Sequence, residues 1–256
     1  SKCLRMSSLI RLFVKIDLRI DVQVEIRAGH FHYLKNVMRL DLGAEFLLFN
    51  GQDGEFLGKI INVNKRSMLV HVVDQVRVQV PDPDIWLLFS PIKRRGMNFV
   101  AEKATELGVT KLLPVLTDYT NNDRVNIERI ETIATEASEQ CGRLTVPNVS
   151  EAKLLTEVIN EWNPARRLLV MDETLTRMED IKEKALRMSA LKFKENDMPC
   201  DAILIGPEGG FSESELDKLG KLTFVSKITL GPRVLRAETA AAVALGLWNE
   251  LIEVKN

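Results

Sequence analysis

Two glycine-proline turns near the C-terminus hold the residues whose types and spacing could form a site for chemistry. Residues 205–211 read Ile-Gly-Pro-Glu-Gly-Gly-Phe, and residues 230–236 read Leu-Gly-Pro-Arg-Val-Leu-Arg. Each turn follows an apolar run typical of a buried strand, and a glycine at a strand end lets backbone groups come close to a ligand. The two turns therefore predict a binding site for a small molecule.

The spacing of the glycines does not match two common phosphate-binding motifs. Gly206, Gly209 and Gly210 do not form the G-x-G-x-x-G dinucleotide fingerprint, and no Gly-Lys-Ser or Gly-Lys-Thr follows them to hold a triphosphate and its magnesium. A nucleotide-binding α/β enzyme is therefore a disfavoured alternative.

The helix that follows the first turn has a clear start. Ser212 and Glu215 have the spacing of a capping box, and Phe211 and Leu216 have the spacing of a hydrophobic staple. We therefore expect the glycine loop to be anchored at its far end.

The elements that must hold these turns alternate between strands and helices from about residue 85 onward. Apolar runs predict strands at 85–89, 112–116, 168–171, 202–205 and 227–230. Helical periodicity and caps predict helices over 97–107, 127–140, 178–188, from 212, and over 238–253. This alternation predicts an α/β fold with a mostly parallel sheet covered on both faces. Ligands bind beyond the carboxyl ends of such strands, which brings Met171, Gly206 and Leu230 to one rim.

The first eighty residues follow a different pattern. Short strands are predicted at 12–16, 22–26, 45–49, 56–63 and 67–73, with a short helix over 30–39. This pattern favours a small β-barrel. Two prolines and two aspartates in residues 80–84 end it, so the predicted domains are residues 1–80 and 81–256.

Composition narrows the class of protein. The chain has 256 residues, 45% of them hydrophobic, which is enough for a substantial core. No run approaches the roughly 18 apolar residues of a membrane span, and the N-terminus lacks a signal-peptide core, so we expect a cytoplasmic protein. The three cysteines have no C-x-x-C spacing and the three histidines no His-x-x-x-His spacing, so we predict no metal site.

Charge is distributed unevenly along the chain. The formal net charge is only −1, which argues against binding nucleic acid through bulk charge. Residues 1–40 nevertheless hold eight basic residues (Lys2, Arg5, Arg11, Lys15, Arg19, Arg27, Lys35, Arg39) against three acids (Asp17, Asp21, Glu25). This excess is compatible with an ordinary solvated face or with an RNA-docking module. Arg39 is the better RNA candidate, because a guanidinium can grip a phosphate with two hydrogen bonds.

Both glycine turns resemble the C-terminal signature of the RsmE family, which belongs to the SPOUT class of RNA methyltransferases. The matching motifs are I-G-P-E-G-G-F at 205–211 and L-G-P-R-V-L-R-A-E-T-A at 230–240. Residues 102–109 (E-K-A-T-E-L-G-V), 136–143 (E-A-S-E-Q-C-G-R) and 32–39 (H-Y-L-K-N-V-M-R) also resemble family segments. The resemblance covers nearly the whole chain.

The resemblance implies a specific activity and architecture. It implies a homodimer that uses S-adenosyl-L-methionine to methylate N3 of a uridine in 16S (small-subunit) ribosomal RNA. It also implies a SPOUT-type parallel sheet with a C-terminal trefoil knot, preceded by a PUA-like RNA-binding β-barrel. The implied cofactor-binding residues are Met171, Ile205, Gly206, Pro207, Glu208, Gly209, Gly210, Leu230, Gly231, Val234, Leu235 and Thr239. The expected RNA-binding residues are Arg11, Lys35, Arg39, Lys93, Arg94 and Arg143.

Methyl transfer from a sulfonium requires that the protein position the acceptor and stabilise the negative charge that the acceptor gains as it loses a proton. Arg236 is the predicted catalytic residue, because a guanidinium favours an ionised uridine. It could instead lock the loop by pairing with Glu208 or Glu238, and Arg233 could simply be solvated. Glu208 could act as a general base, although ordering of the loop through backbone hydrogen bonds is the favoured interpretation.

One position departs from the family pattern. Tyr119 stands where the family usually has an arginine, and the role of that arginine is either lost or passes to Arg124. Two further alternatives stay open: another RNA target for the same class of methyltransferase, and a non-catalytic RNA-binding protein of ribosome assembly.

Overall fold

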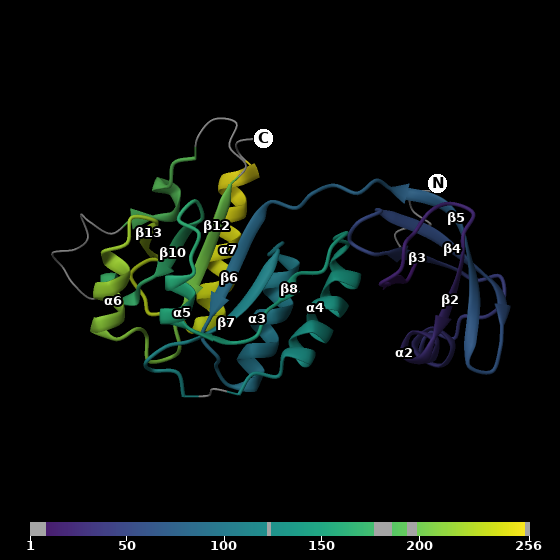
Figure 1. Cartoon of the computed structure of the whole chain (residues 1–256), viewed down its shortest axis with the longest axis horizontal. Coiled ribbons are helices and arrows are strands. Elements are labelled where there is room, and N and C mark those ends of the chain that lie inside the picture. The colour runs from purple at the N-terminus through teal and green to yellow at the C-terminus, as the bar shows by residue number, and fades with distance from the viewer. Residues whose placement is uncertain (1–8, 122–123, 177–185, 194–198, 254–256) are drawn as a thin grey trace. The chain divides into compact units, whose positions relative to one another are not determined.

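The computed structural model describes residues 9–121, 124–176, 186–193 and 199–253 (Figure 1). The chain divides into two units, which we call the N-terminal unit (residues 1–81 with 138–146) and the C-terminal unit (residues 82–137 with 147–256). Most of the helix predicted over 178–188 lies outside the described residues, and its described end is not α-helical: it forms the strand β11 (Leu186–Arg187) and the start of the 3-10 turn η4 (Met188–Ala190). In the described part no helix is long and apolar enough to cross a membrane.

The N-terminal unit is built on a curled five-stranded sheet with the strand order β1-β3-β4-β5-β2. The strands are β1 (Arg11–Phe13), β2 (Gln23–Arg27), β3 (Glu45–Phe49), β4 (Glu55–Val63) and β5 (Ser67–Arg77). β1 pairs parallel with β3, and the other pairs are antiparallel. The predicted barrel region is therefore a β-structure, with α2 (Ala28–His32) and the π-helix η1 (Tyr33–Val37) between β2 and β3.

Alternation along the strands fills the inner side of this curled sheet. In β2, Val24 and Ile26 are buried, whereas the residues between and beside them are exposed. They join a cluster that includes Phe46, Ile60 and Val70, and Leu34 seals it from η1 with no exposed surface. Burial of this apolar set is the main stabilising term for the unit.

The C-terminal unit is an α/β structure around an eight-stranded sheet in which every pair of neighbouring strands is parallel. The strand order is β11-β13-β10-β12-β6-β7-β8, and β9 also pairs with β7. The strands are β6 (Asp84–Phe89), β7 (Lys111–Leu116), β8 (Asn148–Val149), β9 (Lys153–Leu154), β10 (Arg167–Met171), β11 (Leu186–Arg187), β12 (Cys200–Ile205) and β13 (Val225–Thr229). The predicted parallel sheet is confirmed.

Helices cover the sheet of the C-terminal unit. They are α3 (Arg94–Glu106), α4 (Ile127–Cys141), α5 (Leu155–Asn160), α6 (Glu213–Gly220) and α7 (Ala237–Glu253), with the 3-10 turns η2 (Glu173–Thr176) and η4 (Met188–Ala190). Residues of α5 and α6 pack with Leu88, Val170 and Leu204 in one core cluster. The helices α3 and α7 pack together, and α7 packs on β12 (Figure 1).

Several elements differ from the prediction. Helix α3 begins at Arg94 rather than at residue 97, so the basic residues at 94 and 95 lie on the helix. Strand β5 continues to Arg77, past the predicted end at 73. The segment from 148 to 160, for which no element was predicted, holds β8, β9 and α5, which are too short to show a clear period.

Ion pairs and hydrogen bonds hold the amino ends of the central strands in place. Asp84 at the start of β6 pairs with Arg166 and accepts a hydrogen bond from Thr110 at 2.7 Å. Burial alone would raise the pKa of the Asp84 carboxyl, but these hydrogen bonds and the charge of Arg166 outweigh burial and lower the pKa below its usual value. Asp201 at the start of β12 accepts from the buried Trp248 of α7 at 2.8 Å. The opposite, carboxyl ends of the strands are where the glycine turns lie.

Candidate active site

Three neighbouring strands of the C-terminal unit end at one cavity. β10, β12 and β13 are parallel and adjacent, so their carboxyl ends lie at one edge of the sheet. The cavity there has a volume of about 350 Å³. Its lining includes all the predicted cofactor-binding residues except Gly231 and Thr239, namely Met171, Ile205, Gly206, Pro207, Glu208, Gly209, Gly210, Leu230, Val234 and Leu235.

The glycines of the first turn allow close packing around this cavity. A Cβ on Gly206 would lie 3.1 Å from the ring of Phe211, and a Cβ on Gly209 would lie 3.3 Å from the Cβ of Tyr119. Gly210 has a φ of 71°, a left-handed conformation that favours glycine, and a Cβ there would meet Glu173 Oε1 at 3.0 Å. Side chains at these positions would therefore push the loop out of place.

The loop is anchored by the predicted capping box, which the structure confirms. The Ser212 backbone N–H donates to Glu215 Oε2 at 2.9 Å, and the Glu215 N–H donates to Ser212 Oγ at 3.2 Å. Phe211 packs on a core cluster, whereas its staple contact with Leu216 stays a prediction.

The turn that follows β7 is held to the start of the same helix, and the sequence did not predict this link. The Ser212 hydroxyl donates to Asp118 Oδ2 at 2.5 Å, and the Asp118 N–H donates to Glu215 Oε1 at 2.8 Å. Asp118 lies just after β7, so these bonds fix the loop that follows β7 to the loop that follows β12.

The second glycine turn has its own local bracing. Gly231 has a φ of 121°, and its N–H donates to Thr229 Oγ1 at 3.3 Å. Beyond it, Val234 is 52% exposed and Leu235 is half-buried, and both line the cavity. The turn thus offers apolar side chains to a ligand without burying them in the core.

A wider groove of about 1450 Å³ adjoins the cavity. Glu208 and Arg236 line both spaces, whereas Thr239, at the start of α7, lines only the groove. The rest of the groove combines cations (Lys93, Arg95), carboxylates (Glu102, Glu238), amides (Asn98, Asn121) and the aromatic ring of Phe99. Sequence reasoning singled out Lys93 but missed Asn98, Phe99 and Asn121, because a lone amide or aromatic residue carries no spacing signal.

Arg236 and Glu208 are exposed at this shared wall. Within the part of the chain that the structure describes, neither side chain has a hydrogen-bond or ion-pair partner. The alternative role for Arg236, an ion pair with Glu208 or Glu238 that locks the loop, is therefore not observed. The same holds for the loop-ordering hydrogen bonds considered for Glu208.

The floor of the cavity holds a carboxylate that the sequence did not single out. Asp172 is buried and accepts hydrogen bonds from the Thr174 N–H at 2.9 Å and from Thr174 Oγ1 at 2.6 Å. Lys227 Nζ lies 3.8 Å from its other oxygen. Among the described residues no cluster of three or more His, Cys, Asp or Glu could hold a metal ion.

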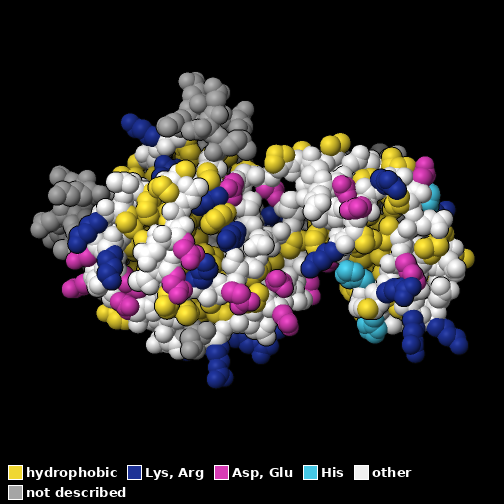
Figure 2. Space-filling model, in the orientation of Figure 1, with side chains coloured by type: hydrophobic (Ala, Val, Ile, Leu, Met, Phe, Trp, Pro, Cys, Tyr) yellow, Lys and Arg dark blue, Asp and Glu magenta, His cyan; other side chains and the backbone are white. Residues whose placement is uncertain are grey.

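The candidate RNA-binding residues fall into different environments. Arg39 is exposed, and Lys35 pairs with Asp41 at 2.8 Å. Lys93 and Arg94 are exposed at the start of α3. On the face drawn in Figure 2, basic and acidic side chains are interspersed, and this face shows no large patch of basic side chains alone.

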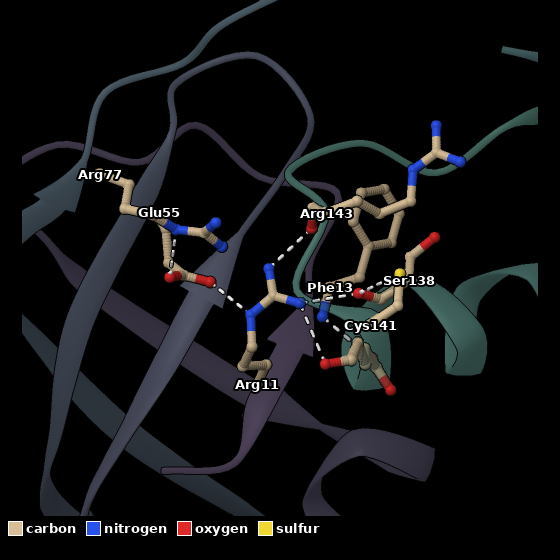
Figure 3. Close-up of polar contacts among 8 residues, drawn as sticks. Arg11, Phe13, Glu55, Arg77, Ser138, Cys141 and Arg143 are labelled. Atoms are coloured by element: carbon tan, nitrogen blue, oxygen red, sulfur yellow. Dashed lines mark hydrogen bonds and ion pairs between the residues drawn. The ribbon is translucent and has the colours of Figure 1, made fainter. Parts of the chain in front are cut away.

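Arg11 does not fit its predicted role as an RNA contact. Its side chain is only 11% exposed and donates to Glu55 Oε2 at 2.5 Å (Figure 3). It also donates to three backbone carbonyls, those of Ser138 at 2.7 Å, Glu139 at 3.0 Å and Arg143 at 2.7 Å. With every side of the guanidinium occupied, Arg11 is a structural residue that binds the segment 138–146 within the N-terminal unit.

Arg143 has a partly structural environment as well. Its carbonyl accepts from Arg11, while its side chain points away and donates to Thr145 Oγ1 at 2.8 Å (Figure 3). Any contact of Arg143 with RNA stays a prediction.

Comparison with known proteins identifies relatives for both units. The family described as "RNA methyltransferase domain" matches residues 80–249, and "RNA methyltransferase PUA domain" matches residues 27–73. Ribosomal RNA small subunit methyltransferase E of Rickettsia conorii is 33% identical over 92% of this chain and 93% of its own. The protein of the same name from Buchnera aphidicola (subsp. Schizaphis graminum) is 28% identical, with the same coverage.

Solved structures share the fold. A putative methyltransferase from Legionella pneumophila, determined with the bound cofactor S-adenosylmethionine, is 26% identical with a TM-score of 0.81, over 95% of this chain and 98% of its own. Ribosomal RNA small subunit methyltransferase E from Neisseria gonorrhoeae, bound to S-adenosylmethionine, is 23% identical with a TM-score of 0.81 and the same coverage.

Proposed function

This chain belongs to the RNA methyltransferase family of ribosomal RNA small subunit methyltransferase E, and we propose that it methylates N3 of a uridine in small-subunit ribosomal RNA. It is an S-adenosylmethionine-dependent ribosomal RNA methyltransferase with a PUA domain. The atom methylated and the residues that act on it are our proposal.

The observation that carries the proposal is a cavity and a groove that share one wall. The cavity at the ends of β10, β12 and β13 lies in the size range of small-molecule sites and combines an apolar lining with the backbone of a glycine loop. This environment fits S-adenosylmethionine, which supplies the electrophilic methyl group. The adjoining groove, with its cations and amides, suits an RNA strand that presents its base at the shared wall.

Arg236 is the residue we propose to act on the acceptor. A uridine that loses its N3 proton spreads the negative charge onto O2 and O4, and a guanidinium can donate hydrogen bonds to such oxygens. Arg236 is exposed at the shared wall, and no described residue occupies its guanidinium. Glu208, at the same wall, is the carboxylate we propose as proton acceptor, and we assign the unpaired state of its side chain to that role.

The remaining cofactor and RNA contacts follow from position. We propose that Met171, residues 205–210, Leu230, Val234 and Leu235 bind the cofactor, together with Gly231 and Thr239. Residues 1–80 are proposed as the RNA-docking domain and residues 81–256 as the methyltransferase domain. Arg39 and Lys35 would contact RNA from the first, and Lys93 and Arg94 from the second.

We also propose a homodimer and a trefoil knot. Helix α7 carries an exposed stripe of Val243, Gly246 and Leu247, in which the two larger side chains are 37% and 43% exposed. A small residue flanked by apolar ones allows two helices to pack closely, so this stripe is suited to meet a second copy. Residues 230–239 passing against 206–210 would form the knot, which is supported by the cavity that both segments line. An enzyme of ribosomal RNA is expected in the cytoplasm.

Calorimetry with four small molecules tests the proposed cofactor site. The protein should bind S-adenosylmethionine and its demethylated product with a Kd in the micromolar range, which corresponds to a binding free energy on the order of −8 kcal/mol. It should not bind ATP or NAD. Binding of ATP or NAD without affinity for S-adenosylmethionine would favour the nucleotide-binding alternative, and binding of none of the four would favour a non-catalytic RNA-binding protein.

A further inference from the structure

Tyr119 is a half-exposed aromatic residue beside the glycine loop. Its side chain is 50% exposed. It lies close to Gly209, because a Cβ built on that glycine would be 3.3 Å from the Tyr119 Cβ and 3.7 Å from Cγ and Cδ2. Gly209 lines the cofactor cavity, so one side of Tyr119 faces the loop that forms this cavity.

The turn that carries Tyr119 is fixed by hydrogen bonds on both sides of it. The Thr117 N–H donates to Thr120 Oγ1 at 2.8 Å, and the Thr120 N–H donates to the Thr117 carbonyl at 3.1 Å. Asp118 is bound at both its backbone and its carboxylate to the start of α6, through Glu215 and Ser212. An aromatic ring on such a turn loses little conformational entropy when it binds a ligand.

The surroundings of Tyr119 suit an unpaired nucleobase. Asn121, two residues along, lines the groove, whose charged lining combines the cations Lys93, Arg95 and Arg236 with the carboxylates Glu102, Glu208 and Glu238. Cations can hold phosphates and an amide can bond a base edge, but a splayed base also needs a flat surface on which to stack. A phenol ring that is half exposed offers such a surface, whereas a ring that served only packing would be expected to be more fully buried.

We propose that Tyr119 is a positioning residue for the RNA, whose ring stacks on an unpaired base that enters the groove. The inference rests on the proposed function, since it deepens the description of the same acceptor site.

Three variants of the full-length chain test the proposal: Tyr119→Phe, Tyr119→Leu and Tyr119→Ala. Binding is measured with single-stranded oligouridine and with an oligomer of the same length that has one abasic position in its centre. Stacking predicts that Tyr119→Ala and Tyr119→Leu weaken oligouridine binding by about 5- to 100-fold, while Tyr119→Phe stays within about twofold. The penalty for the abasic position should be present in the wild type and lost in Tyr119→Ala.

Further readouts separate stacking from a packing role. S-adenosylmethionine affinity and Tm should be unchanged in all three Tyr119 variants, and KM for ribosomal RNA should rise with only a small change in kcat. If Tyr119→Ala binds both oligomers like the wild type, or if it loses cofactor affinity and Tm together, the inference is wrong. A Tyr119→Phe variant as weak as Tyr119→Ala would also overturn it, because the hydroxyl rather than the ring would then be the contact.

Failure of the proposed function has a different signature. A wild-type protein that transfers no methyl group to small-subunit ribosomal RNA contradicts the proposed function. The oligomer comparison is an equilibrium measurement that needs no methyl transfer, so it reports on stacking by Tyr119 in either case.

Discussion

Arg236, from the second glycine turn, and Glu208, from the first, both line the wall that the strand-end cavity shares with the adjoining groove. Neither side chain is paired with a described residue, although the two carry opposite charges. If a cofactor in the cavity reacts with a substrate in the groove, polar groups at the shared wall must be free to contact both molecules. We interpret the unpaired state of the two residues as part of the site's function.

Replacement of Arg236 should slow the chemical step more than it weakens cofactor binding. Removing one preorganised donor to a developing charge costs on the order of 3 kcal/mol in the barrier, or roughly a hundredfold in rate. Single-turnover methylation by Arg236→Ala should fall by about that factor, with S-adenosylmethionine affinity nearly unchanged. Arg236→Lys should recover only part of the rate, because it keeps the charge but loses the planar fork.

Arg233→Ala is the matched control for Arg236→Ala. Arg233 belongs to the same turn and is exposed, but it lines the cavity and not the groove. Its removal should leave the single-turnover rate nearly intact. If Arg236→Ala instead loses cofactor affinity and Tm while its rate at saturating cofactor is normal, Arg236 stabilises the loop and has no catalytic role.

A side chain at Gly209 should displace the glycine loop and impair cofactor binding. Gly209→Val would bring its Cβ within 3.3 Å of Tyr119 and would narrow the cavity that Gly209 lines. Calorimetry should show a loss of S-adenosylmethionine affinity of about tenfold or more, equivalent to about 1.4 kcal/mol. Gly220→Ala is the control, because a Cβ there meets only the flexible end of Lys227 at 3.5 Å. Equal cofactor affinity in both variants would contradict the proposed site.

Charge reversal at Arg39 should weaken RNA binding without affecting the cofactor. Arg39 is exposed in the N-terminal unit. If it binds a phosphate as proposed, Arg39→Glu removes that contact and adds a repulsive charge. The RNA affinity should fall, and the slope of log K against log salt should become shallower by about one unit. Arg94→Glu should act in the same way from the C-terminal unit. Unchanged slopes in both variants would remove these residues from the RNA interface.

Replacement of Arg11 should lower stability. Arg11→Ala leaves Glu55 Oε2 and three backbone carbonyls without their donor at a largely buried site, while Arg77 still donates to Glu55 Oε1 at 2.9 Å. Breaking a buried pair from one side typically costs on the order of 3 kcal/mol. The midpoint of urea unfolding should therefore fall clearly. In the control Arg27→Ala, the pair with Glu25 is solvent-exposed, so a much smaller change is expected. Equal effects would contradict the structural role of Arg11.

The ion pair of Asp84 and Arg166 should make stability pH-dependent in acid. The pKa of Asp84 is lowered on folding, so its ionised form stabilises the native state above the unfolded pKa of about 3.8. This contribution is lost as the pH falls through the lower, folded-state pKa. Asp84→Asn should therefore be less stable than the wild type at pH 7, and the difference should shrink below about pH 4. Urea unfolding at a series of pH values measures it, and a pH-independent difference would rule out the charge as its source.

Local patterns in the sequence were enough to predict the longer strands, the parallel sheet and the capped start of α6, but not the two-residue strands β8, β9 and β11. Ser212 and Glu215 lie three residues apart, and a cap depends only on such neighbours. Interactions between distant residues could not be predicted in this way. Arg11 bonds a carbonyl 127 residues away, and Asp118 bonds a hydroxyl 94 residues away, so no window of sequence contains both partners.

The candidate site was predictable to a similar extent. The glycine turns predict a cavity because each one follows an apolar run typical of a buried strand. Arg236 lies inside one of the motifs that resemble the family. Asn98 and Asn121 come from separate loops and helices, and they meet only because α3 and the loop after β7 fold to the same groove. Their side chains carry no spacing signal that would distinguish them from ordinary surface residues.

Mapping of methylated nucleosides tests the central claim most directly. The purified protein is incubated with labelled S-adenosylmethionine and small-subunit ribosomal RNA that has not been methylated, and the RNA is then digested to nucleosides and analysed by mass spectrometry. Our account predicts label in N3-methyluridine, at one position of the RNA, and its near absence with Arg236→Ala. Label on a ribose oxygen or on another base, or no transfer with the wild-type protein, would contradict it.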